Sequence, residues 1–121
     1  MTADPSLLPI AAEIRRHGHA APYATLVLSG GYEEAGDAGR HRVGAGAVLI
    51  HGDFSAHRDV TGRRPTAVLD LPLPPGRASW PARGRIDDPD AIVRLAQCDS
   101  SAAAEWLLSA LTPDPAQEED L

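Results

Sequence analysis

The sequence contains no lysine and no asparagine, and its only cysteine is Cys98. A single cysteine excludes an intramolecular disulfide and a cysteine cluster that could hold a metal. No apolar run is long enough to span a bilayer, and the first residues lack the basic segment and long apolar core of a secretion signal. We therefore expect no membrane association, and a bacterial cytoplasmic protein is the starting hypothesis.

Positive charge is also scarce in this chain. The 121 residues carry a formal net charge of −6, with 11 arginines against 17 acidic residues. This length predicts one domain with a small core. A net negative charge opposes binding to nucleic acid, and the helical segments near the C-terminal end are apolar and acidic rather than basic. We expect no direct nucleic-acid binding by this chain.

Short apolar segments separated by turn residues dominate residues 1–75. Strands are expected at "YATLVLSG", in both arms of "YEEAGDAGRHRVGAG", at "AVLIHGD" and at "TAVLDLPLP". In the first of these, period-two alternation places Ala24, Leu26 and Leu28 on one face and Thr25, Val27 and Ser29 on the other. Several short strands with frequent turns predict a mostly β domain, either a small barrel or a flattened sandwich.

The pattern changes after a Pro- and Gly-rich connection at residues 76–87. Two short helices are expected within residues 88–111, with Asp88 as N-cap and Pro89 at the first helical position. Residues 112–121 are proline-broken and acidic, which is typical of a tail or linker. Cys98 is expected to be a small buried apolar residue. The helix residues expected to be buried are Ile92, Leu95, Ala96, Trp106, Leu107 and Leu111.

Short amphipathic helices are not stable alone in water. They must bury their apolar faces either on the strands or on a second copy of the chain. A homodimer formed through the helices is therefore one expected outcome.

Two of the five histidines, His17 and His19, lie in "RHGHA". Residues two apart in a strand lie on one face, so these imidazoles could share a metal ion if the segment is extended. His57 is the first candidate for a third ligand, His51 is the second, and His41 is a weaker one among arginines. Three imidazoles in a small barrel suit zinc, iron, nickel or copper. The alternative is that the histidines rim a polar pocket without metal, and spacing leaves both open.

The other polar residues near the histidines have separate expected roles. Tyr23 and His51 are expected to line a ligand pocket. Glu33 and Glu34 are adjacent in an expected strand and point to opposite faces, so they cannot act as a carboxylate pair and are read as solvated hairpin charges. Asp53 and Asp59 could orient an imidazole, but turn and surface roles are the simpler interpretation.

The first seventy-odd residues resemble a cupin, a small double-stranded β-helix barrel. Its first motif has an H-x-H, then a glutamate, then a glycine; here "HGH" supplies His17 and His19, and Gly30 suits the glycine. In "GAVLIHGDFSAH", Gly46 precedes His57 with the spacing of the second motif. The motif glutamate is missing, since its place falls on Pro22 or Tyr23. The resemblance thus implies either a site with three histidine ligands and no carboxylate, or a decayed site.

Residues 15–111 also resemble the amino-terminal sensing domains of transcription regulators of the AraC (arabinose-regulator) family. The segments that carry this likeness are "YATLVLSGGYEEAGDAGRHRVGAGAVLIH", "LDLPLP" and "DPDAIVRLAQCDSSAAAEWLL". The resemblance implies a cupin-like module that binds a small-molecule effector, without the helix-turn-helix half of such regulators. A free-standing metallo-cupin enzyme that oxygenates, isomerises or cyclises a small organic substrate is the alternative.

The implied site has a definite ligand preference. Three neutral imidazoles leave the charge of a divalent transition metal uncompensated, so an anionic effector or substrate, such as a carboxylate, is expected in the open coordination positions.

Overall fold

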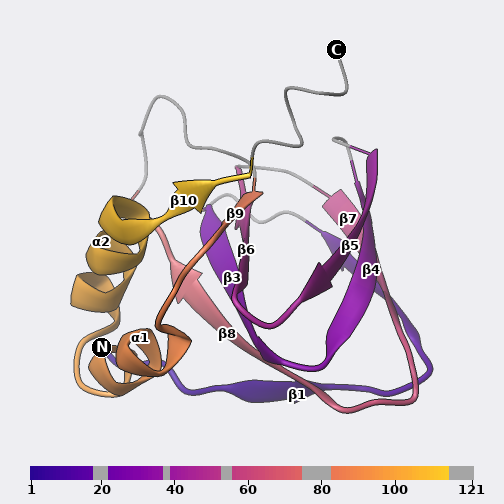
Figure 1. Cartoon of the computed structure of the whole chain (residues 1–121), viewed down its shortest axis with the longest axis horizontal. Helices are drawn as coiled ribbons and strands as arrows, with labels where there is room; N and C mark the ends of the chain where they lie inside the picture. Colours follow the sequence, from indigo (N-terminus) through magenta and orange to yellow (C-terminus); the bar gives the residue numbers. More distant parts are fainter. Residues whose placement is uncertain (18–21, 37–38, 53–55, 75–82, 115–121) are drawn as a thin grey trace.

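The computed structural model describes residues 1–17, 22–36, 39–52, 56–74 and 83–114. Within these residues the chain forms two antiparallel sheets and, near its C-terminal end, two helices (Figure 1). Sheet A has the strand order β1-β8-β3-β6-β9-β10. Its strands are β1 (Ser6–Leu8), β3 (Tyr23–Ser29), β6 (Ala47–His51), β8 (Thr66–Pro72), β9 (Arg83–Arg85) and β10 (Thr112–Pro113).

Sheet B has the order β2-β7-β4-β5. Its strands are β2 (Glu13–His17), β4 (Gly31–Gly36), β5 (Gly39–Gly44) and β7 (Ala56–Thr61). The chain crosses between the sheets repeatedly, and β4 and β5 pair as the expected hairpin, with Gly36 opposite Gly39. Strand pairing does not join the two sheets into a closed ring within the described residues. The expected mostly β fold is confirmed, and it has the form of an open sandwich.

The turn between β3 and β4 needs glycine at Gly30. Its φ is +74°, in the left-handed region that side chains other than glycine rarely adopt. The hydroxyl of Thr66 then fixes the next residue, because it accepts a hydrogen bond from Gly31 N at 3.1 Å and lies 3.0 Å from Gly31 O. This turn carries the chain from sheet A to sheet B, so the facing of the two sheets depends on it.

Helix α1 spans Pro89–Ala96 and α2 spans Ser100–Ala110. The expected cap is confirmed: the Asp88 side chain accepts a hydrogen bond from Ala91 N at 3.2 Å, with Pro89 in the first turn. Asp99 caps α2 in the same way, accepting from Ala102 N at 3.1 Å. Neither helix is long and apolar enough to cross a bilayer.

The helices cover the face of sheet A that points away from sheet B. Alternate residues of β3 confirm this: Ala24 and Leu26 pack with Ile92 and Leu107 of the helices, whereas Val27 packs in a separate cluster between the sheets. The sequence pattern thus predicted the two faces of β3 correctly. Both faces are buried because the helices cover one and sheet B covers the other.

Two short strands lie where the sequence predicts a connection and a tail. β9 pairs with β6, and β10 pairs with β9, so they extend sheet A at its edge. Segments of three and two residues are too short to show alternation, so no sequence pattern indicates them.

Cys98 is exposed, and the prediction that it is buried is wrong. It follows the C-cap Gln97, where the chain has already left the helix.

Trp106 is also placed differently from the prediction. It is 43% exposed, whereas Leu107 is fully buried. The buried residues of α2 follow the spacing i, i+3, i+4 and i+7, namely Ser100, Ala103, Ala104 and Leu107. Trp106 lies off this stripe. The small residues of the stripe, rather than the large tryptophan, bring the helix close to its neighbours.

We expect Trp106→Ala to lower the free energy of unfolding by less than about 1 kcal/mol, because a half-exposed side chain leaves no closed cavity. Urea denaturation of the variant and the wild type measures this difference. A loss of about 3–5 kcal/mol, the usual cost of truncating a buried tryptophan, would show that Trp106 is covered in solution by another copy of the chain. The homodimer itself stays a prediction.

Candidate functional site

The space between the two sheets is divided into an apolar part and a polar part. The apolar part is a cluster of buried residues from both sheets: Val27, Tyr32, Val43, Ala47, Leu49 and Val68. Further along the same strands, the side chains between the sheets become ionisable. Such a change from apolar to polar lining is typical of a ligand pocket built into a hydrophobic core.

Sheet A contributes Tyr23 and His51 to the polar part. They are register partners on β3 and β6, so they share a face, and their ring centroids lie 4.5 Å apart with an interplanar angle of 35°. On β6 the alternation continues from the apolar cluster, since Ala47 and Leu49 belong to it and His51 is the next residue on that face. His51 is only 6% exposed. Stacking against Tyr23 therefore fixes the orientation of a buried imidazole.

Sheet B contributes Glu34 and Asp59. These residues are register partners on β4 and β7, and both are buried, with Glu34 9% and Asp59 0% exposed. Glu34 also pairs in register with His41 of β5, which is half-buried. Two carboxylates directly opposite each other repel, and burial of each costs free energy of desolvation. Each buried carboxylate therefore needs compensating partners.

The two sheets meet through Glu34 and His51. The Oε2 atom of Glu34 lies 3.8 Å from Nε2 of His51. An imidazole beside a carboxylate can hold or release a proton, and both groups can hydrogen-bond to a polar ligand. We call Tyr23, Glu34, His51 and Asp59 the interior polar cluster.

A buried hydrogen bond extends this polar lining on sheet A. The Thr25 hydroxyl donates to Oδ1 of Asp70 at 2.6 Å, and the two residues are register partners on β3 and β8. Thr25 is fully buried and Asp70 half-buried. The polar character of the interior thus continues onto a third strand of the same sheet.

Two of the three predicted metal ligands, His17 and His57, lie on neighbouring strands of sheet B. His17 ends β2 opposite Ala56, and His57 of β7 lies opposite both Arg16 and Gly36. The structure therefore brings these two positions onto paired strands, one register step apart. The side chains of His17 and His57 are outside what the structure describes, and His19 and Asp53 lie outside the described residues altogether. Among the described side chains, no three His, Cys, Asp or Glu residues are placed to hold a metal ion.

Two members of the cluster were missed by sequence reasoning. Glu34 is not a solvated hairpin charge, and Asp59 is neither in a turn nor on the surface; both interpretations are wrong. Glu33 and Glu34 do lie on opposite faces as predicted, since Glu33 is partly exposed and forms an ion pair with Arg40 at 3.3 Å. The signal was present in the period of β4: Tyr32 faces the core, and Glu34, two residues on, must share its face.

No protein-family model matches the chain, and no curated protein is significantly similar to it. Solved structures do share its fold. The DMSP lyase DddQ from Ruegeria pomeroyi has a TM-score of 0.54 and 21% identity, over 71% of this chain and 42% of that one. A cupin protein, BF4112 from Bacteroides fragilis, has a TM-score of 0.51 and 17% identity, over 62% of this chain and 66% of that one.

A third structure, the plu4264 protein from Photorhabdus luminescens, has a TM-score of 0.51 and 15% identity, over 55% of this chain and 56% of that one. The match thus spans less than two thirds of the length of each of these structures. At such identities the likeness establishes the fold. The chain has a cupin-like fold, which agrees with the resemblance seen in its sequence.

Proposed function

We propose that this chain is a small-molecule-binding cupin module whose ligand occupies the polar part of the interior. The observation that carries the proposal is the burial of Glu34, His51 and Asp59 between the two sheets. Replacing buried ionic groups by apolar residues of similar volume is often neutral or stabilising in proteins. Ionisable groups retained at this position are therefore better explained by a polar ligand than by stability.

We further propose that His17, His19 and His57 hold one divalent transition metal at this pocket. The donor set fits such an ion, since neutral imidazoles are common ligands of zinc, iron, nickel and copper. The proposal rests on this donor set and on the cupin resemblance, because the register of β2 with β7 sets His17 and His57 one step apart, at positions on opposite faces of the sheet. A metal held only by neutral ligands would supply a positive centre for an anionic group of the ligand.

The biological role we propose is effector sensing, as in the regulator domains that the sequence resembles, with a cytoplasmic location. The interior polar cluster would then bind one small organic acid selectively, through hydrogen bonds donated by Tyr23 and His51. The effector would be an anion, since the proposed metal keeps its charge.

The alternative proposal is a metallo-cupin enzyme. The closeness of Glu34 and His51 favours it, because a carboxylate and an imidazole 3.8 Å apart can move protons to and from a bound substrate. The DMSP lyase DddQ has a similar fold, but at 21% identity this likeness does not extend to its reaction.

Equilibrium dialysis against a defined mixture of small carboxylic acids, with mass spectrometry of both compartments, separates these roles. A sensing module is expected to concentrate one acid unchanged, and His51→Phe, which keeps a ring and removes its hydrogen-bond donor, is expected to weaken that retention at least about tenfold. An enzyme would consume one acid and release a product. If no acid is retained or consumed by the metal-supplemented protein, the interior is not a ligand pocket.

A further inference from the structure

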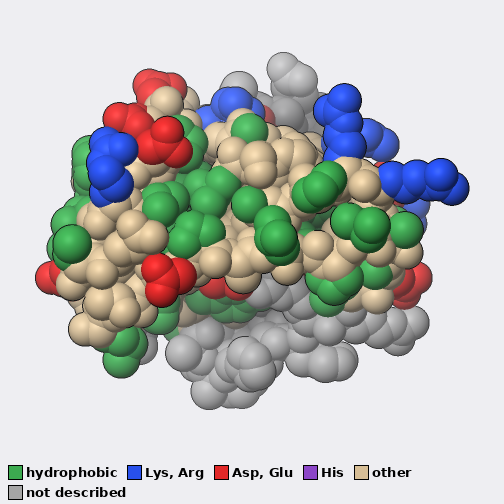
Figure 2. All heavy atoms as spheres, turned by 90° about the horizontal axis from the view of Figure 1, so that it is seen from below, with side chains coloured by type: hydrophobic (Ala, Val, Ile, Leu, Met, Phe, Trp, Pro, Cys, Tyr) green, Lys and Arg blue, Asp and Glu red, His purple; other side chains and the backbone are tan. Residues whose placement is uncertain are grey.

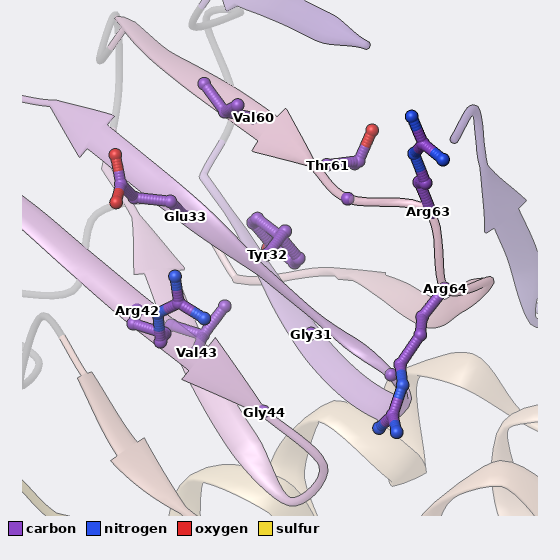
Figure 3. A pocket seen from close by; sticks show the side chains of 12 residues that line it. Gly31, Tyr32, Glu33, Arg42, Val43, Gly44, Val60, Thr61, Arg63 and Arg64 are labelled. Atoms are coloured by element: carbon purple, nitrogen blue, oxygen red, sulfur yellow. The ribbon is translucent and has the colours of Figure 1, made fainter. Parts of the chain in front are cut away.

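A cavity lies away from the interior polar cluster. It has a volume of about 560 Å³ and lies where β4 begins and β5 and β7 end. None of the four residues of the interior polar cluster lines it. The side chains that give it chemical character are those of Glu33, Arg42, Val60, Arg63 and Arg64 (Figure 3). It is therefore a separate site with its own lining.

The cavity is positively charged in a negatively charged protein. Three of the 11 arginines of the chain, Arg42, Arg63 and Arg64, line it, against one carboxylate, Glu33. The Glu33 carboxylate already pairs with Arg40 at 3.3 Å. Figure 3 shows Arg42 on one side of the cavity and Arg63 and Arg64 on the other, with the guanidinium groups of Arg63 and Arg64 directed away from each other. Within the described part of the chain, no ion pair joins any of the three to a carboxylate.

The net charge of −6 makes such a gathering of arginines informative. Figure 2 shows arginine side chains projecting at the end of the molecule away from the helices, and both basic and acidic side chains at the helix end. An isolated surface arginine is usually solvated and has no further role. Three that surround one cavity create a local positive potential that attracts anions.

The connection that carries Arg63 and Arg64 is held in place at both ends. At its start, the Thr61 hydroxyl donates to Pro9 O at 2.6 Å and accepts from Ala12 N at 2.9 Å. At its end, the buried Thr66 hydroxyl bonds to Gly31 of the neighbouring turn. A ligand would therefore order two side chains but not the backbone, which reduces the entropic cost of binding.

The lining also contains apolar surface. Val60 is 43% exposed, although it lies in the middle of sheet B, and it shares a face of the sheet with its register partner Glu33 and with Arg42. Guanidinium groups pair with carboxylate or phosphate oxygens in bidentate geometry. The exposed Val60 side chain next to them suits a ligand with a short hydrocarbon or aromatic body.

We propose that this cavity binds a small organic anion, with its carboxylate or phosphate on Arg63, Arg64 and Arg42 and its apolar body against Val60. The site is independent of the interior pocket, so an empty interior would leave this inference intact. A carboxylate ligand and a phosphate ligand would both present anionic oxygens and an apolar body. Titration with one compound of each kind distinguishes them.

The test is isothermal titration with phenyl phosphate, benzoate and inorganic phosphate. We expect saturable binding of at least one aromatic anion, tighter than that of inorganic phosphate and weakened by added salt. The double variant Arg63→Ala/Arg64→Ala should weaken binding at least about tenfold. Arg94→Ala is the matched control, because Arg94 is an exposed arginine on α1 and does not line the cavity. Its affinity should equal that of the wild type.

Three results would overturn the proposal: no saturable binding up to about 10 mM, equal losses in the double variant and in Arg94→Ala, or binding unchanged in the double variant. The last result would place the anion elsewhere, including the interior. Circular dichroism checks the fold of each variant. If the double variant is unfolded, Arg42→Ala, which changes a residue on a different strand, replaces it. Its affinity for the anion should also fall at least about tenfold relative to Arg94→Ala.

Discussion

Gly30→Ala is expected to lower the free energy of unfolding by about 2–4 kcal/mol. A side chain at Gly30 must accept the left-handed conformation, which costs about 1–2 kcal/mol. A Cβ atom would also overlap the carbonyl oxygen of Pro65 and lie 2.9 Å from the Cα of Thr66. Backbone atoms cannot move aside as a flexible side chain can, so the turn itself must shift at further cost.

Gly62→Ala is the matched control. A Cβ at Gly62 meets no atom within 4 Å, and its φ is not in the left-handed region. This variant should be neutral or slightly more stable, because alanine restricts the unfolded chain. Urea denaturation at equilibrium measures both differences. Equal stabilities of the two variants would show that the turn between β3 and β4 is not built as described.

The sequence was sufficient for the elements that depend on local chemistry. The strands of the β4–β5 hairpin, the two faces of β3 and the cap at Asp88 are set by turn glycines, period-two alternation and a capping side chain. Each of these signals acts within about ten residues. They remain readable because no distant contact overrides them.

The interior polar cluster could be predicted only in part. Tyr23 and His51 were expected together at a pocket, and the structure stacks them. Glu34 and Asp59 were assigned to the surface because charged residues are rarely buried. Their burial is decided by how sheet B packs on sheet A, across many residues of sequence. A period of two shows which residues share a face, but it does not show which face is covered.

The buried residues of α2 also could not be predicted from residue type alone. Burial of Trp106 was expected because large apolar side chains are usually buried. The stripe that packs is instead made of Ser100, Ala103, Ala104 and Leu107. Small residues allow close approach of α2 to its neighbours, and the tryptophan then falls outside the contact. Residue size was a poorer guide here than the i, i+3, i+4, i+7 spacing.

The second large effect concerns the three histidines. We expect the chelator-stripped protein to bind one equivalent of zinc, iron(II), nickel or copper, and His19→Ala or His57→Ala to lose at least about 10–100-fold in affinity. Loss of a residue that merely supports a ligand already costs that much. Imidazoles bind metal only when deprotonated. Affinity should therefore fall as the pH decreases below about 6.5, the pKa of free histidine.

The metal titration, followed calorimetrically, is also the most direct test of the proposed site. Its matched control is His41→Ala, which removes a half-buried histidine of β5 that is not among the proposed ligands. We expect one tight site in the wild type and in His41→Ala, and a weak one in His19→Ala and His57→Ala. Equal affinities in all four proteins, or no binding tighter than about millimolar in the wild type, would contradict it.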